Sequence, residues 1–98
     1  MNNSKDIMKQ LAEVISVKRY QSTDTSYTAR LFKKGRIKIA NKLGEEATET
    51  ISAFLSQGSD EIKDEAADMI YHLLVLLEYS EISWEEILKT LEKRMKND

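Results

Sequence analysis

Two pairs of acidic residues are the part of this sequence best suited to chemistry. Glu46 and Glu49 lie three residues apart, as do Glu65 and Asp68, and both pairs lie in sequence that favours helix. Residues at i and i+3 share a helix face, so each pair presents two carboxylates together. The short break at Gln57-Gly58-Ser59 allows the two helices to fold back side by side. Four converging carboxylates repel one another unless a cation lies among them.

The positions of these acids on their helices favour a site at a cleft edge. At about 100° per residue, Glu46 lies about 60° from the centre of its apolar stripe, and Glu49 about 120°. Glu65 and Asp68 lie about 100° from the core stripe of their own helix. Counted from Gly58, Glu49 and Asp68 lie at similar height in an antiparallel hairpin. All-oxygen ligands suit Mg²⁺, with Mn²⁺ as a substitute. The alternative is that such charges form only a solvated face.

Two lysines and a histidine lie next to the acidic pairs in the sequence. Lys38, Lys42 and Glu46 follow one another at intervals of four residues along one flank. Lysines near a bound cation suit the phosphates of a substrate, whereas spacing alone equally allows Lys42 to pair with neighbouring glutamates. His72, the only histidine, lies one turn beyond Asp68. A lone histidine in an apolar helix is more often a packing residue than a catalytic one.

The helices that must position these residues follow from apolar periodicity and breaker residues. Periodicity predicts helices over about residues 4–18, 27–34, 36–56 and 60–79, and a last helix after residue 83. The two longest form a central antiparallel hairpin. No strand pattern, repeat or linker is present. The sequence therefore predicts a single all-α domain over residues 1–98, a helical bundle of four to five helices.

Local signals fix the ends of these helices. Asn3 or Ser4 is placed to cap the first helix, and Thr25 or Ser26 the second. Gly35 is expected to end the second helix, and the capping box of the last helix begins at Ser83.

The apolar faces are large for one chain of 98 residues. The second half of the helix over residues 60–79 is apolar nearly all round, which indicates burial on more than one side. We therefore expect a homodimer to complete the bundle, with a self-sufficient monomer as the alternative. The stripe expected on the third helix includes Ile51 and Phe54, and that on the last helix includes Leu88, Leu91 and Met95.

Composition excludes several other classes of protein. The formal net charge of −2 provides no basic field for nucleic acid, and the absence of cysteine excludes disulfides and thiol chemistry. No apolar segment follows the polar N-terminus as a secretory signal would require, and the longest apolar run, residues 69–77, is too short to span a bilayer. A cytoplasmic protein that does not bind membranes is expected.

Five segments of the sequence occur in the same order as in a known family. They are Ser26-Tyr27-Thr28-Ala29-Arg30-Leu31, Gly35-x-x-Lys38-Ile39, Lys42-Leu43-Gly44-Glu45-Glu46-Ala47-Thr48-Glu49, Glu65-Ala66-Ala67-Asp68 and Tyr71-His72-Leu73-Leu74-Val75-Leu76-Leu77. In these segments the sequence resembles the phosphoribosyl-ATP pyrophosphohydrolase family, within the all-α, MazG-like superfamily of nucleoside triphosphate pyrophosphohydrolases, and the match runs from about Leu11 to Arg94. The EExxE and ExxD elements alone indicate the superfamily, whereas Ser-Tyr-Thr-Ala and Tyr-His-Leu-Leu-Val indicate this member.

The resemblance implies Mg²⁺-dependent hydrolysis of the α–β phosphoanhydride of phosphoribosyl-ATP, the second step of histidine biosynthesis. It also implies a stand-alone form, without the cyclohydrolase domain that is fused in many relatives. By position, the metal ligands are Glu46, Glu49, Glu65 and Asp68, and the candidate general bases are Glu45 and Glu46. The expected substrate-binding residues are Ser26, Tyr27, Lys38, Lys42 and His72. Asn41 departs from the family, whose members often carry a further lysine there.

Two other functions remain as alternatives. One is a related MazG-like pyrophosphohydrolase acting on canonical or damaged nucleoside triphosphates. The segment 26–31 argues against it, because this segment is a feature of the histidine-pathway member and is placed to contact the extra ribose phosphate. The other is a non-catalytic helical interaction module whose acids only solubilise one face.

Overall fold

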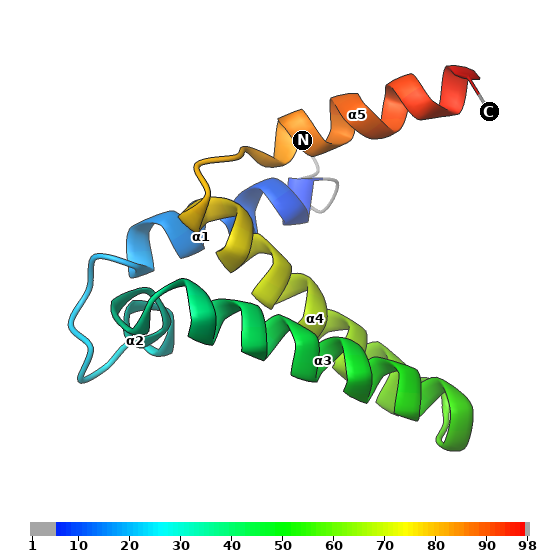
Figure 1. The fold of residues 1–98 in the computed structure, drawn as a ribbon, viewed down its shortest axis with the longest axis horizontal. Coiled ribbons are helices and arrows are strands. Elements are labelled where there is room, and N and C mark those ends of the chain that lie inside the picture. The colour runs from blue at the N-terminus through cyan, green and yellow to red at the C-terminus, as the bar shows by residue number, and fades with distance from the viewer. Residues whose placement is uncertain (1–5, 98) are drawn as a thin grey trace.

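The computed structural model describes residues 6–97 and contains five helices, with no strand among these residues (Figure 1). The predicted all-α fold is confirmed. The proposed caps Asn3 and Ser4 lie outside the described residues. The helices are α1 (Ile7–Lys18), α2 (Tyr27–Lys34), α3 (Arg36–Ser56), α4 (Ser59–Tyr79) and α5 (Trp84–Asn97).

The long helices α3 and α4 form the predicted antiparallel hairpin, lying side by side along their lengths (Figure 1). The turn between them consists of Gln57 and Gly58. The Gly58 backbone N–H donates to the carboxylate of Glu61 at 3.1 Å, which satisfies a donor that would otherwise be left free where α4 begins. This turn brings the two acidic segments onto facing helices.

The short helix α2 is fixed at both ends by residues that the sequence analysis selected. The Ser26 hydroxyl accepts a hydrogen bond from the Ala29 backbone N–H at 3.0 Å, so Ser26 caps the helix. Gly35 follows the last residue of α2 with φ of 92° and ψ of −172°, a conformation that is essentially restricted to glycine. The chain can therefore turn from α2 directly into α3.

The core lies where α1 and α2 cover the C-terminal half of α4. Its most deeply buried large side chains are Ile15, Leu31 and Val75, one from each of these three helices. Just after α1, the Arg19 guanidinium lies 3.1 Å from the Glu78 carboxylate and 4.3 Å from the Phe32 ring centroid. This contact ties the end of α1 to both α2 and α4.

Two predicted packing stripes are not buried in the single chain. Ile51 and Phe54, near the turn of the hairpin, are 58% and 69% exposed, because no other helix covers this end of α3. The helix α5 has no buried residue, and its Leu88, Leu91 and Met95 are exposed. The sequence identified these residues as packing faces, and within one chain they are exposed. The expected homodimer stays a prediction.

The start of α5 follows its predicted capping box. The Glu86 backbone N–H donates to the Ser83 hydroxyl at 3.2 Å, and the Ser83 backbone N–H donates to the Glu86 carboxylate at 2.8 Å. From this start α5 extends away from the hairpin and contacts α1 (Figure 1). None of the helices within residues 6–97 is long and apolar enough to cross a membrane.

Candidate metal and nucleotide site

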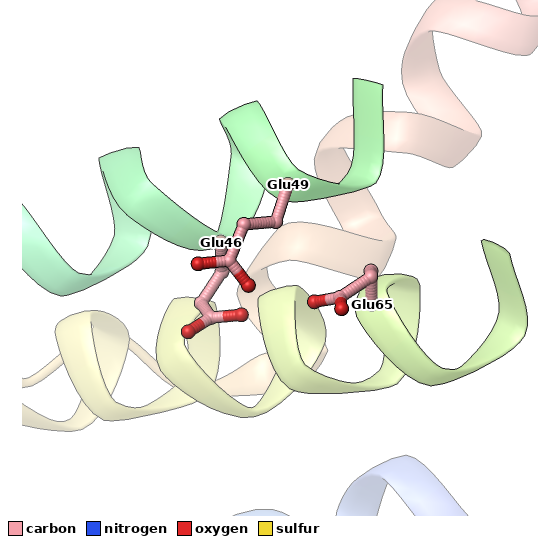
Figure 2. A group of neighbouring side chains, drawn as sticks. All are labelled: Glu46, Glu49 and Glu65. Carbon is pink, nitrogen blue, oxygen red and sulfur yellow. The ribbon is translucent and has the colours of Figure 1, made fainter. Parts of the chain in front are cut away.

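Three carboxylates meet between the two helices of the hairpin. Glu46 and Glu49 on α3 face Glu65 on α4, as Figure 2 shows. One carboxylate oxygen from each of the three residues lies within 4.8 Å of the other two. Glu46 is buried, Glu65 is half-buried and Glu49 is exposed, so the cluster opens from the helix interface towards solvent. The hairpin thus brings together three of the four acids that were predicted to bind metal.

The cluster lacks the partners that buried carboxylates normally have. Glu46 Oε1 and Glu65 Oε1 are both buried, and neither has a hydrogen-bond partner among the residues that the structure describes. The contact with Glu49 raises the pKa of Glu65 above its ordinary value, with a further contribution from burial. Unpaired, converging carboxylate oxygens are the donor set that a hard divalent cation uses. The residues present therefore fit such a cation.

Asp68, the fourth predicted ligand, lies one turn after Glu65 on α4 and is exposed. Its charge adds to the effects that raise the pKa of Glu65, so it acts on the cluster electrostatically. Across the hairpin Glu49 lies near Glu65, whereas the residue count from Gly58 placed Glu49 level with Asp68. The role of Asp68 as a metal ligand stays a prediction.

Glu45 and Lys42 pair with each other beside the cluster. The Lys42 ammonium lies 3.3 Å from the Glu45 carboxylate, an i, i+3 pair on α3. This contact raises the pKa of Lys42, and the nearby Tyr27 and Glu46 add to the effect. The alternative that Lys42 pairs with a neighbouring glutamate is thus confirmed. Lys38 lies one turn earlier on α3 and is half-buried. Both lysines remain predicted phosphate-binding residues.

The other predicted substrate-binding residues lie where α2 meets α4. The Ser26 side chain is buried, and its hydroxyl both caps α2 and donates to the Lys18 carbonyl oxygen at 3.3 Å. Tyr27 is 42% exposed, and its hydroxyl oxygen lies 3.0 Å from His72 Nε2. His72 is buried, and its Nδ1 lies 2.8 Å from the Asp68 carbonyl oxygen. Their substrate contacts stay predictions.

Thr28 and Tyr71, for which no role was predicted, join α2 to α4 next to Tyr27 and His72. Their hydroxyl groups share a hydrogen bond, and the Tyr71 ring packs against both Tyr27 and His72. Burial raises the pKa of Tyr71. The signal available in the sequence was their position: each is adjacent to a residue that had been selected.

The hairpin of α3 and α4 holds unpaired carboxylates, which suit a cation, beside lysines, which suit phosphates. This arrangement is typical of a small all-α hydrolase of phosphoanhydrides. Comparison with known proteins makes this class specific. The chain belongs to the phosphoribosyl-ATP pyrophosphohydrolase family, which matches residues 8–95.

Curated relatives agree with this family. The chain is 44% identical to a phosphoribosyl-ATP pyrophosphatase of Metallosphaera sedula over 93% of this chain and 98% of the relative. It is 51% identical to one of Paramagnetospirillum magneticum over 78% of this chain and 70% of the relative. It is also 42% identical to a bifunctional histidine biosynthesis protein of Buchnera aphidicola over 94% of this chain, which spans 44% of that longer relative.

Proposed function

We propose that this chain hydrolyses the α–β phosphoanhydride of phosphoribosyl-ATP to phosphoribosyl-AMP and pyrophosphate, the second step of histidine biosynthesis. The observation that carries the proposal is the cluster of Glu46, Glu49 and Glu65, with its two buried and unpaired oxygens, in a chain of this family. The names of the relatives supply the substrate, and the cluster supplies the chemistry.

We propose Mg²⁺ as the cation of this site, held by Glu46, Glu49 and Glu65, with Asp68 as the fourth candidate ligand. When bound, such a cation neutralises phosphate charge and polarises a phosphoryl oxygen. The converging carboxylates account for selection of a hard cation over softer metals.

The side chains around the cluster have separate tasks in this proposal. Lys42 and Lys38 lie one and two turns from Glu46 on α3, where their charges bind phosphate oxygens and stabilise the charge that leaves with pyrophosphate. A carboxylate that accepts the proton of the attacking water completes the reaction, and Glu45 and Glu46 are the candidates. Glu46 lies inside the buried cluster, whereas Glu45 is exposed. Comparing the variants E45Q and E46Q therefore separates the loss of cation binding from the loss of proton transfer.

We also propose a cytoplasmic homodimer. The support is the apolar surface that one chain leaves uncovered, chiefly Ile51, Phe54 and Leu55 at the end of α3 and the face of α5. Light scattering after size exclusion should give twice the mass of the chain, and Phe54→Asp should lower it. A monomeric mass at micromolar concentration would contradict this part of the proposal.

The experiment that tests the proposed reaction is pyrophosphate release from phosphoribosyl-ATP, measured beside ATP and deoxynucleoside triphosphates. Rapid turnover of phosphoribosyl-ATP and slow turnover of the others is expected. The reverse preference would favour the MazG-like alternative. No turnover of any nucleotide, with Mg²⁺ affinity unchanged by Glu49→Gln, would favour the non-catalytic module.

A further inference from the structure

A cavity lies next to the predicted substrate-binding residues, where α1, the loop after it and the start of α2 meet α4. This loop lies at one end of the molecule (Figure 1). The cavity has a volume of about 360 Å³, which is at the small end of the range for ligand sites and suits one part of a larger substrate. Val14 and Ile15 of α1 form one side of it, and the rings of Tyr27 and Tyr71 form another.

The rest of the cavity lining is mainly polar. It includes the side chains of Lys18, at the end of α1, and of Gln21 and Thr25 in the loop. Within residues 6–97, the Lys18 ammonium and the Gln21 side-chain amide have no hydrogen-bond or ion-pair partner. The Thr25 hydroxyl donates to the Ser22 carbonyl oxygen at 3.4 Å, so its lone pairs are free to accept. The cavity therefore offers a cation and several hydrogen-bonding groups to a ligand.

Arg30 adds a second cation beside this cavity. Its guanidinium carbon lies 5.9 Å from the centroid of the Tyr27 ring, and its Nη1 donates to the Thr23 carbonyl oxygen at 2.9 Å. This partner is neutral, and in the described part of the chain neither Arg30 nor Lys18 forms an ion pair with a carboxylate. Residues 25–44 contain six lysines and arginines and no acid. Two positive charges without a carboxylate partner favour an anionic ligand group.

Tyr27 connects the cavity with the carboxylate cluster. Its ring lines the cavity, and its hydroxyl oxygen lies 3.0 Å from His72 Nε2, one turn after Asp68 on α4. Along α4, Tyr71 lies about 9 Å beyond Glu65, at 1.5 Å per residue. A nucleoside can span a distance of this order. One substrate can therefore place its reacting phosphates at the cluster and a second group in the cavity.

We infer that this cavity binds the second ribose phosphate of the substrate, and that Lys18 and Arg30 hold its phosphate group. Apart from the triphosphate, the second ribose is the only part of phosphoribosyl-ATP that carries a phosphate. Neither adenine nor the nucleoside ribose has a negative charge for these cations to bind. This inference rests on the proposed function, and it assigns residues to the group that distinguishes phosphoribosyl-ATP from ATP.

The two tyrosine rings and the loop side chains favour a sugar phosphate over a base in this cavity. The rings of Tyr27 and Tyr71 are stacked on each other, with centroids 6.2 Å apart and planes at 29°, so there is no slot for a base between them. Gln21 can both donate and accept, and Thr25 can accept, as the hydroxyl groups of a ribose require.

The first test needs no catalysis. Ribose 5-phosphate is titrated at millimolar concentration into the ¹⁵N-labelled protein without Mg²⁺, with ribose as the comparison. The amide signals of residues 18–28 should shift more than those of residues 42–49, and ribose should cause smaller shifts because it lacks the phosphate. Largest shifts at residues 42–49, or equal shifts with ribose, would overturn the inference.

The second test compares two substrates in each protein. Phosphoribosyl-ATP and its form without the phosphate on the second ribose are assayed for pyrophosphate release by wild type, Lys18→Gln and Arg30→Gln. For wild type, kcat/KM should be at least about 10-fold higher for the phosphorylated substrate. Each variant should lower this ratio about 3- to 10-fold, the worth of one charged contact at an exposed position. Because both substrates are measured with the same protein, any loss of folded protein cancels in the ratio.

The matched control is Lys9→Gln, the same substitution at an exposed lysine of α1 that does not line the cavity. Its ratio should equal that of wild type. No preference of wild type for the phosphorylated substrate, or a wild-type ratio in both Lys18→Gln and Arg30→Gln, would overturn the inference. If wild type turns over neither substrate, the proposed function itself fails, whereas the binding of ribose 5-phosphate tests the cavity independently of turnover.

Discussion

Replacing the buried acid of the cluster should stabilise the metal-free protein and weaken its stabilisation by Mg²⁺. Glu46→Gln keeps the shape of the side chain and removes one of three charges whose oxygens lie within 4.8 Å. Even in a water-like dielectric, two charges at this distance repel by about 0.9 kcal/mol. Glu46 takes part in two such pairs, so the metal-free variant should be more stable than wild type by about 1–2 kcal/mol, or roughly 4–16 °C in Tm for a chain of this size.

Mg²⁺ should reduce or cancel this difference, because wild type binds it more tightly. At ten times the dissociation constant of wild type, a cation that binds only the folded state stabilises it by about 1.4 kcal/mol. A variant whose affinity is tenfold weaker gains only about 0.4 kcal/mol under the same conditions. Thermal unfolding with EDTA and with increasing Mg²⁺ measures both quantities in one experiment.

The matched control is Asp64→Asn, an exposed acid next to Glu65 on α4 that is not part of the cluster. Its Mg²⁺-dependent shift in Tm should equal that of wild type. An unchanged Mg²⁺-dependent shift in Tm in Glu46→Gln would mean that the cation is bound elsewhere, which would contradict the proposed site. A metal-free Tm below that of wild type would show that the cluster carries no net repulsion.

Three further predictions concern stability. Gly35→Ala should destabilise the protein by about 1–3 kcal/mol, because φ of 92° is strained for alanine. Gly44→Ala, inside α3, should stabilise the protein by about 0.5–1 kcal/mol. Urea denaturation measures both changes, and equal effects of the two variants would contradict the role given to the backbone conformation of Gly35. Without metal, the pKa of Glu65 is raised in the folded state. The free energy of unfolding should therefore rise as the pH falls through the folded-state pKa of Glu65 towards the ordinary value of 4.5. A free energy of unfolding that does not change with pH, or the same rise in Glu65→Gln, would contradict this prediction. Ser83→Ala should remove the cap of α5 and cost about 1 kcal/mol in urea denaturation, and no measurable loss would mean that the cap contributes nothing.

The helices and their ends could be predicted because they depend on local interactions. Ser26, Gly35 and Ser83 each act within one turn of their own position, through a side-chain cap or a backbone conformation. Exposure of the stripe at Ile51 and Phe54 could not be predicted, because periodicity shows which face of a helix is apolar and does not show what covers it.

The sequence predicted that the acidic residues face one another across the hairpin, and it did not predict how they pair across it. Spacing along each helix brought Glu46, Glu49 and Glu65 to the facing sides of the hairpin, as the structure shows. The residue count from Gly58 placed Glu49 level with Asp68, and the structure shows Glu49 near Glu65 across the hairpin. The contact of Tyr27 with His72 joins residues 45 apart, so only the packed fold shows it.

In the proposed reaction, this chain releases pyrophosphate from phosphoribosyl-ATP with a cation held by the three carboxylates. The most direct measurement is ³¹P NMR of the products formed from phosphoribosyl-ATP by wild type, in Mg²⁺ and in EDTA. We expect phosphoribosyl-AMP and pyrophosphate in Mg²⁺, and no reaction in EDTA. Release of inorganic phosphate, or pyrophosphate release that persists in EDTA, would contradict it.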